Sequence, residues 1–135
     1  MFSPLMEQII ERENFRIVDE NDYKDFCKEH DIAVIMVAGD YVRIGAVNDV
    51  AVILPELVKA YQGRFTPCIA RRKSEAYFQA TYKFVLLPTL VFFRDGLKIG
   101  AISGVLDWTD YLAQINAILA MPKQVMQNKE NQTQI

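Results

Sequence analysis

Residues 87–96 read Leu-Pro-Thr-Leu-Val-Phe-Phe-Arg-Asp-Gly, a proline that leads into an apolar run and then an Asp-Gly pair. Aromatic and β-branched residues favour extended structure, so Thr89–Arg94 is predicted to be a strand. Asp-Gly is the strongest short signal for a two-residue hairpin turn, because both residues accept a positive φ. A second strand, antiparallel to the first, is therefore predicted over Leu97–Ser103.

Upstream of this hairpin, helical and extended patterns alternate. Residues 32–38 form a continuous apolar run, which is typical of a strand buried on both faces of a sheet. A loop is predicted over residues 39–48 and a long helix over residues 49–61. The predicted order is helix-strand-helix-strand-helix-strand-helix-strand-strand-helix. This order predicts an α/β fold in three layers, with a mixed central sheet and helices on both faces.

Composition and length limit the class of protein. The chain has 135 residues and a formal net charge of −2, which does not favour nucleic acid or an anionic membrane as the main partner. Its apolar runs are too short to span a bilayer, and residues 1–7 lack the pattern of a secretory signal. We therefore expect a cytoplasmic protein without membrane insertion. Residues 1–121 are predicted to form one domain and residues 122–135 a disordered polar tail.

Two cysteines and one histidine carry the thiol and imidazole chemistry of the chain. Cys27 lies on the apolar face of a predicted helix and Cys68 in a predicted strand, so both are predicted to be buried and unreactive. His30 lies near a predicted helix end, and no other His or Cys stands at metal-ligand spacing. The sequence therefore predicts no metal site and no cofactor.

Three segments resemble thioredoxin in their order and content. Residues 54–63, Leu-Pro-Glu-Leu-Val-Lys-Ala-Tyr-Gln-Gly, are similar to the end of its second helix. Residues 87–93 are similar to its cis-proline strand, and Asp95-Gly96 followed by Gly104 is similar to its terminal hairpin. The resemblance implies a thioredoxin-like fold with a cis peptide bond at residues 87–88.

The catalytic cysteines of thioredoxin are missing from this chain. When the thioredoxin pattern is aligned without gaps from residues 61–63, Ile44 and Val47 stand where the two cysteines would be. Since a dithiol needs both thiols, the redox chemistry is predicted to be absent while the scaffold is kept. A binding protein, rather than an oxidoreductase, is the expected outcome.

A closer resemblance is to the hydrogenase accessory family called HyaE or HupG, whose members are thioredoxin-like and lack the Cys-x-x-Cys. The resemblance covers roughly residues 5–119. Its motifs are residues 47–49 and 53–57, Ser74-Glu75-Ala76, residues 88–92, and residues 100–105 with Trp108 and Leu112.

This resemblance implies an accessory chaperone, without enzymatic activity, for maturation of the nickel–iron uptake hydrogenase. It also implies a partner, the twin-arginine signal peptide of the small-subunit precursor. Such a peptide is expected to lie between residues 40–48 and 86–89, with backbone pairing beside Pro88 and apolar burial on the preceding loop. The candidate contact residues are Tyr41, Arg43, Ile44, Val47, Asp49, Leu87, Pro88 and Thr89.

One feature departs from the expected family pattern. Arg71-Arg72-Lys73 stands before Ser74, where acidic residues are expected. These cations would repel a twin-arginine peptide, so the carboxylates that meet its arginines are expected elsewhere. The cluster itself is either a solvated loop or a dock for an acidic partner surface. The candidate carboxylates are Asp40, Asp49 and Glu56.

Two other functions stay open on the residues alone. A thiol-disulfide enzyme of unusual arrangement would use Cys27 or Cys68, and would need an exposed, acidic thiol. A structural subunit of a larger complex, or a homodimer, would use a sheet edge or an aromatic surface. That surface would comprise Tyr77, Phe78, Tyr82 and Phe84, although their helical spacing predicts that most of them are core.

Overall fold

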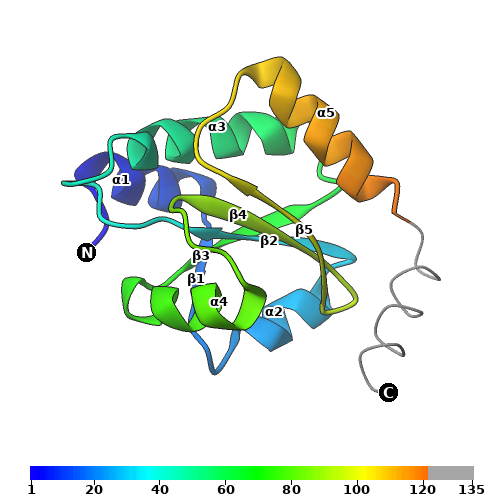
Figure 1. The fold of residues 1–135 in the computed structure, drawn as a ribbon, viewed down its shortest axis with the longest axis horizontal. Helices are drawn as coiled ribbons and strands as arrows, with labels where there is room; N and C mark the ends of the chain where they lie inside the picture. Colours follow the sequence, from blue (N-terminus) through cyan, green and yellow to red (C-terminus); the bar gives the residue numbers. More distant parts are fainter. Residues whose placement is uncertain (122–135) are drawn as a thin grey trace.

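The computed structural model describes residues 1–121, and its elements follow the predicted order (Figure 1). The prediction of a disordered tail over residues 122–135 lies outside the described residues. The helices are α1 (Pro4–Glu13), α2 (Tyr23–Glu29), α3 (Ala46–Ala60), α4 (Glu75–Tyr82) and α5 (Trp108–Leu119), with a short 3-10 helix, η1 (Arg72–Ser74), before α4. The strands are β1 (Arg16–Val18), β2 (Ile32–Val37), β3 (Thr66–Ala70), β4 (Thr89–Arg94) and β5 (Leu97–Ser103).

The strands form one five-stranded sheet in the order β1-β3-β2-β4-β5. β1, β3 and β2 are parallel, whereas β4 is antiparallel to β2 and β5 is antiparallel to β4. All six residues of β2 are buried at the centre of the sheet, as its continuous apolar sequence predicts. β4 and β5 have the predicted bounds. The predicted α/β fold with a mixed sheet is confirmed.

Helices cover both faces of the sheet, which gives three layers (Figure 1). α1, α3 and α5 pack on one face around a core that contains Leu57 and Phe92. α2 and α4 pack on the other face around Tyr23, Phe78 and Phe93. Successive side chains of a strand point to opposite faces, so Phe92 and Phe93 of β4 enter different cores.

The helix that follows β2 begins earlier than the sequence predicts. It starts at Ala46, so the predicted start at Asp49 is wrong and the loop is shorter. The chain already coils before the helix, because the Ile44 N–H donates to the Asp40 carbonyl at 2.8 Å. Asp49 lies in the first turn of α3, where a negative charge interacts favourably with the helix dipole.

The buried stripe of α5 also differs from the prediction. The apolar spacing of Trp108, Leu112, Ile115 and Leu119 predicts that stripe, but Trp108 is the first residue of the helix and is 42% exposed. Tyr111 is buried instead, in line with Ile115 and Leu119 at four-residue spacing. Its hydroxyl donates to the Gly104 carbonyl at 3.1 Å, which ties α5 to the end of β5.

Candidate functional site

The candidate site lies where the chain leaves β2 and enters β4. Val37, the last residue of β2, pairs with Thr89, the first residue of β4. Because the two strands are antiparallel, the residues after Val37 run beside those before Thr89. The Leu87–Pro88 peptide bond, directly before β4, is cis, as the resemblance implied. The loop after β2 and the segment before β4 therefore meet at this end of the sheet.

Gly39 is the contact point between these two segments. It is buried and has a φ of 91°. A Cβ atom at this position would lie 2.9 Å from Cβ of Leu87 and 3.1 Å from Cδ1 of Ile44. Glycine adopts this conformation readily and leaves that space free. The structure thus brings two of the predicted site residues, Ile44 and Leu87, against the same stretch of backbone.

The backbone of Leu87 offers unused hydrogen-bonding groups. Within residues 1–121, neither its N–H nor its carbonyl forms a hydrogen bond. Its neighbours are fixed, because the Pro88 carbonyl accepts the Gly104 N–H at 2.7 Å and Thr89 Oγ1 donates to the Leu86 carbonyl at 2.6 Å. Pro88 and Thr89 are themselves buried. The Leu87 N–H and carbonyl are thus without a hydrogen bond among the described residues, between neighbours that are fixed, which is a precondition for strand addition.

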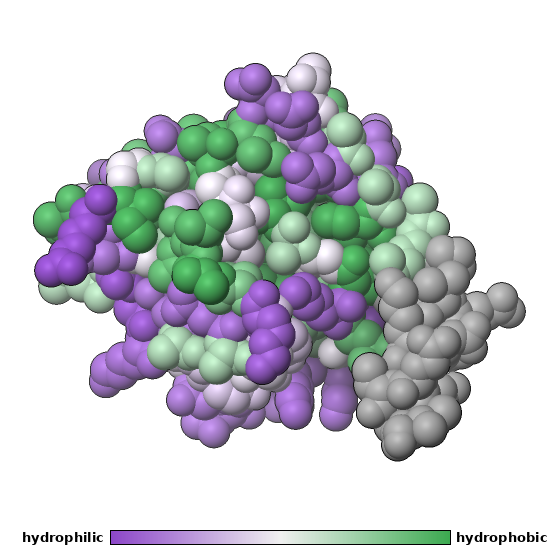
Figure 2. Space-filling model, in the orientation of Figure 1, coloured by the Kyte–Doolittle hydropathy of each residue, from purple (hydrophilic) through white to green (hydrophobic). Residues whose placement is uncertain are grey.

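Large apolar side chains are exposed around this point. Val85 and Leu86 are 85% and 66% exposed, and Val42, in the loop after β2, is 77% exposed. Val105, which follows Gly104, is 47% exposed. Figure 2 shows apolar side chains gathered over the segment between α4 and β4. Exposed patches of this kind mark binding surfaces. We call these four exposed side chains, together with the half-buried Ile44 and Leu87 that contact Gly39, the apolar patch; its members are Val42, Ile44, Val85, Leu86, Leu87 and Val105.

The other predicted site residues have different settings. Arg43 is exposed and lies 3.7 Å from the carboxylate of Asp40. Tyr41 is half-buried against the core, and Asp49 is exposed on α3. Val47, in the first turn of α3, is 1% exposed, so its side chain lies in the core rather than at the surface. The site surface is therefore built from the loop and the cis-proline segment.

Neither cysteine lies at this site. Cys27, in α2, and Cys68, in β3, are free thiols in the core between the sheet and the layer of α2 and α4. Burial raises the pKa of Cys27 to about 11 and raises the pKa of Cys68 well above its ordinary value. A reactive thiolate needs the opposite setting, exposed and beside a cation. The predicted burial of both cysteines is confirmed.

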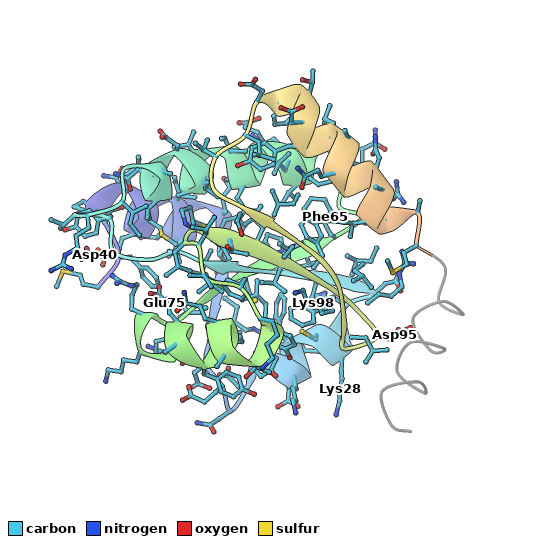
Figure 3. The ribbon with its side chains drawn as sticks, viewed as in Figure 1. Lys28, Asp40, Phe65, Glu75, Asp95 and Lys98 are labelled. Carbon is cyan, nitrogen blue, oxygen red and sulfur yellow. The ribbon has the colours of Figure 1, made fainter. Side chains whose placement is uncertain are left out.

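A buried carboxylate lies directly beside the loop. Glu75, the first residue of α4, is 7% exposed, and its Oε2 accepts the Gly39 N–H at 3.0 Å. Figure 3 shows Glu75 on α4 and Asp40 on the loop at the same end of the molecule. The motif Ser74-Glu75-Ala76 does not predict this burial, because a carboxylate in the first turn of a helix can interact with the helix dipole while it stays exposed.

The basic cluster is not uniformly solvated. Arg71 and Lys73 are exposed, as a solvated loop requires. Arg72 is half-buried, and its Nε lies 2.9 Å from Oε2 of Glu75. Its Nη1 also donates to the Met1 carbonyl at 3.0 Å. The solvated-loop interpretation is therefore wrong for Arg72.

The aromatic residues of α4 belong mainly to the core. Phe78 is buried, and Tyr77, Tyr82 and Phe84 are half-buried against the same core. The Tyr23 hydroxyl lies 2.6 Å from the Tyr82 hydroxyl and 3.1 Å from that of Tyr77. The predicted core role is confirmed, and little aromatic surface is left for a subunit contact.

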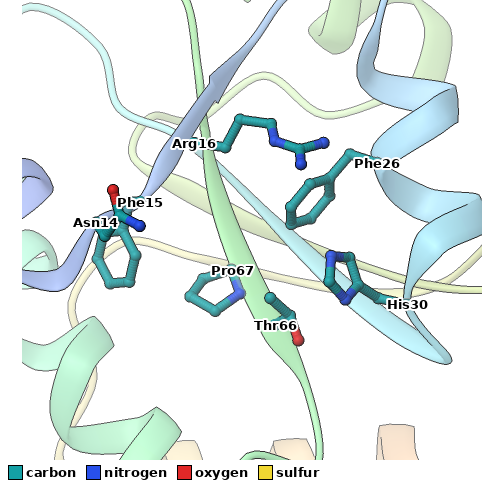
Figure 4. Close-up of a pocket in the computed structure, with 7 residues that line it drawn as sticks. All are labelled: Asn14, Phe15, Arg16, Phe26, His30, Thr66 and Pro67. Carbon is teal, nitrogen blue, oxygen red and sulfur yellow. The ribbon is translucent and has the colours of Figure 1, made fainter.

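A shallow pocket of about 380 Å³ lies where β3 begins, at the opposite end of the sheet from Gly39 (Figure 4). The guanidinium of Arg16 is already engaged there, 3.1 Å from the Glu29 carboxylate and 5.2 Å from the centre of the Phe26 ring. No group of three or more metal-ligating side chains lies together within the described part of the chain. The pocket offers no clear ligand chemistry. Its lining residues are Asn14, Phe15, Arg16, Phe26, His30, Thr66 and Pro67.

A mixed five-stranded sheet with a cis-proline segment beside the loop after β2, and no cysteine in that loop, defines a thioredoxin-like domain without the dithiol. Among solved structures, a thioredoxin variant from Halobacterium salinarum superposes with a TM-score of 0.63 at 18% identity, over 79% of this chain and 92% of that one. That likeness establishes the fold.

Nearer relatives establish the family. The family described as "Hydrogenase-1 expression protein HyaE" matches residues 5–111. The hydrogenase expression/formation protein HupG of Rhizobium leguminosarum is 33% identical over 93% of this chain and 87% of its own length. HoxO of Azotobacter vinelandii, also a hydrogenase expression/formation protein, is 37% identical over 89% of this chain and 80% of its own length. The chain therefore belongs to the HyaE family, and the resemblance read from the sequence is confirmed.

A solved structure agrees with this assignment. The hydrogenase expression/formation protein HupG of Rhodopseudomonas palustris is 35% identical and superposes with a TM-score of 0.55. The match covers 78% of this chain and 95% of that one. The protein is thus a hydrogenase expression/formation protein with a thioredoxin-like fold.

Proposed function

We propose that this chain is a redox-inactive chaperone that binds the twin-arginine signal peptide of a hydrogenase small-subunit precursor. The observation that supports this most is the unpaired backbone of Leu87 inside the apolar patch. A signal peptide carries an apolar stretch and, when extended, a backbone with matching donors and acceptors. Pairing with Leu87 would align the peptide, and the apolar patch would bury its apolar side chains.

The arginines of the peptide need carboxylates near the apolar patch. The side chain of Asp40 is 42% exposed, and its partner Arg43 lies at 3.7 Å in an exposed ion pair of low stability. Asp49 is exposed in the first turn of α3. Glu56 lies further along α3 and is 3.7 Å from Lys59. Asp40 and Asp49 are therefore the better-placed carboxylates for guanidinium groups.

The cytoplasm is the compartment that this function requires. A chaperone that holds a precursor before export must meet it where it is synthesised. Within residues 1–121, none of the helices could span a bilayer. A homodimer formed through the apolar patch would cover the surface that the client needs, so peptide binding should dissociate any such dimer.

The test is a fluorescence titration that uses Trp108. This side chain is 42% exposed. It lies four residues after Gly104, whose N–H donates to the Pro88 carbonyl at the candidate site. The probe is a synthetic twin-arginine signal peptide of a hydrogenase small subunit, and the control is the same peptide with both arginines replaced by lysine. We expect saturable binding in the micromolar range and weaker binding of the lysine peptide. No saturable response to either peptide would contradict the proposal. Sizing chromatography with and without peptide measures the oligomeric state.

A further inference from the structure

The loop after β2 is held by a side chain from the opposite layer of the fold. The Gly39 N–H donates to Oε2 of Glu75 at 3.0 Å. Glu75 opens α4 on one face of the sheet, whereas the loop leads into α3 on the other face (Figure 1). The bond therefore fixes the backbone of Gly39 relative to both layers.

The burial of Glu75 indicates a specific role for its charge. Its side chain is 9% exposed, and a buried carboxylate is unfavourable unless a cation and hydrogen-bond donors compensate its lost hydration. Arg72 supplies the cation, with Nε at 2.9 Å from Oε2. The guanidinium is itself held, because its Nη1 donates to the Met1 carbonyl at 3.0 Å. One carboxylate oxygen thus joins a fixed cation to the Gly39 N–H.

We propose that Glu75 is a positioning residue of the client site. Its carboxylate, neutralised by Arg72, fixes Gly39 and thereby the spacing between Ile44 and Leu87. Both side chains pack against Gly39, since a Cβ atom there would lie within 3.1 Å of each. A displaced Gly39 would separate the loop half of the apolar patch from the cis-proline half. The effect on a client rests on the proposed function, whereas the effect on Gly39 does not.

Four variants separate the charge from the hydrogen bond. Glu75→Ala removes both the acceptor for Gly39 and the partner of Arg72. Glu75→Gln keeps an amide oxygen that accepts the Gly39 N–H, but loses the charge. Arg72→Gln removes the cation and leaves the carboxylate, and Arg72→Lys restores a cation. Arg71→Gln and Lys73→Gln are matched controls, because both residues belong to the same basic cluster and are exposed.

Amide hydrogen exchange of the free protein measures the positioning. We expect the Gly39 amide to exchange about tenfold faster, or more, in Glu75→Ala, since hydrogen bonds to charged groups are strong. Glu75→Gln and Arg72→Gln should give intermediate rates, while Arg72→Lys and the two controls stay close to wild type. Glu75→Gln preserves the shape of the side chain, so it tests the same point if Glu75→Ala does not fold.

Affinity for the signal peptide measures the consequence for the client. The variants should lose affinity in the same order as their Gly39 amides gain exchange rate. Phe26→Leu, in the α2 layer, controls for a general loss of stability and should keep wild-type affinity. Wild-type Gly39 exchange in both Glu75 variants would overturn the positioning role, whether or not the peptide binds. Faster exchange with unchanged affinity would overturn the link to the client. If wild type binds no peptide, the proposed function fails, and the exchange rates still decide the role of Glu75.

Discussion

Leu87 lies against the backbone of Gly39, so closely that a Cβ atom on the glycine would come within 2.9 Å of the leucine Cβ. This contact joins the loop after β2 to the cis-proline segment before β4. The side chains that meet there are apolar, and the two thiols of the chain lie in the core between the sheet and the α2 and α4 layer. The geometry is suited to holding a peptide by backbone pairing and apolar burial.

Replacing Gly39 with alanine should destabilise the fold. The new methyl group would meet Leu87 and Ile44, and alanine would have to hold a φ of 91°. We expect the free energy of unfolding to fall by about 2–3 kcal/mol. Gly63→Ala is the matched control, because its φ is 74° but nothing lies within 4 Å of its Cβ position. It should lose only about 1 kcal/mol. Urea unfolding measures both, and equal losses would show that the contact does not matter.

Replacing Leu86 with serine should weaken the client complex without weakening the fold. The side chain is 66% exposed, so it buries little apolar area in the free protein and its loss should change the free energy of unfolding little. Its burial by a peptide would contribute about 1–2 kcal/mol, so we expect roughly a tenfold loss of affinity. Val52→Ser, on the exposed face of α3, is the control. An equal loss in the control variant would place the client elsewhere.

The two thiols should be dispensable for client binding. Since Cys27 and Cys68 are buried, native protein should react slowly with an alkylating reagent at pH 8, and urea-unfolded protein should react fast. A double variant, Cys27→Ala with Cys68→Ala, should bind the signal peptide with wild-type affinity despite a lower stability. Fast alkylation of the native protein, or lost affinity at matched stability, would revive the thiol-enzyme alternative.

Stability should decrease in alkaline solution through Cys27. Burial raises the pKa of this thiol in the folded chain to about 11, from an ordinary value of 9.0. Between these values the unfolded chain releases the proton while the folded chain keeps it, so the unfolded state is favoured as pH rises. The contribution is complete below pH 9 and is lost through pH 11, up to about 2 kcal/mol. Urea unfolding across this range should show a shallower decline for Cys27→Ala than for wild type. Identical slopes would contradict the assignment.

Local sequence patterns were sufficient to predict most of the fold. The hairpin of β4 and β5 has its predicted bounds, because the Asp-Gly turn fixes where each strand starts and stops. The start of α3 at Ala46 does not follow from the sequence, since Gly45 before it offers no side-chain cap and the chain coils through a hydrogen bond from the Ile44 N–H to the Asp40 carbonyl. Apolar spacing predicts a buried Trp108, but spacing alone does not show that this residue opens the helix.

The centre of the candidate site was less accessible to prediction. Leu87 and Pro88 follow from the motif, but the role of Gly39 depends on two segments that are far apart in sequence. The burial of Glu75 depends on a bond between layers, which no local pattern encodes. Val47 is also misleading as a site candidate. The thioredoxin pattern aligns it with a catalytic cysteine, but its side chain is on the buried face of α3.

The most direct test of client binding at this site is to map the peptide on the protein by amide chemical shifts. The isotope-labelled chain would be titrated with the twin-arginine signal peptide of a hydrogenase small subunit. Client binding at this site should give saturable shifts at Gly39, Ile44, Leu87 and Val105, with the Leu87 amide becoming protected from hydrogen exchange. No saturable shift, or shifts confined to α2 and the pocket of Figure 4, would contradict it.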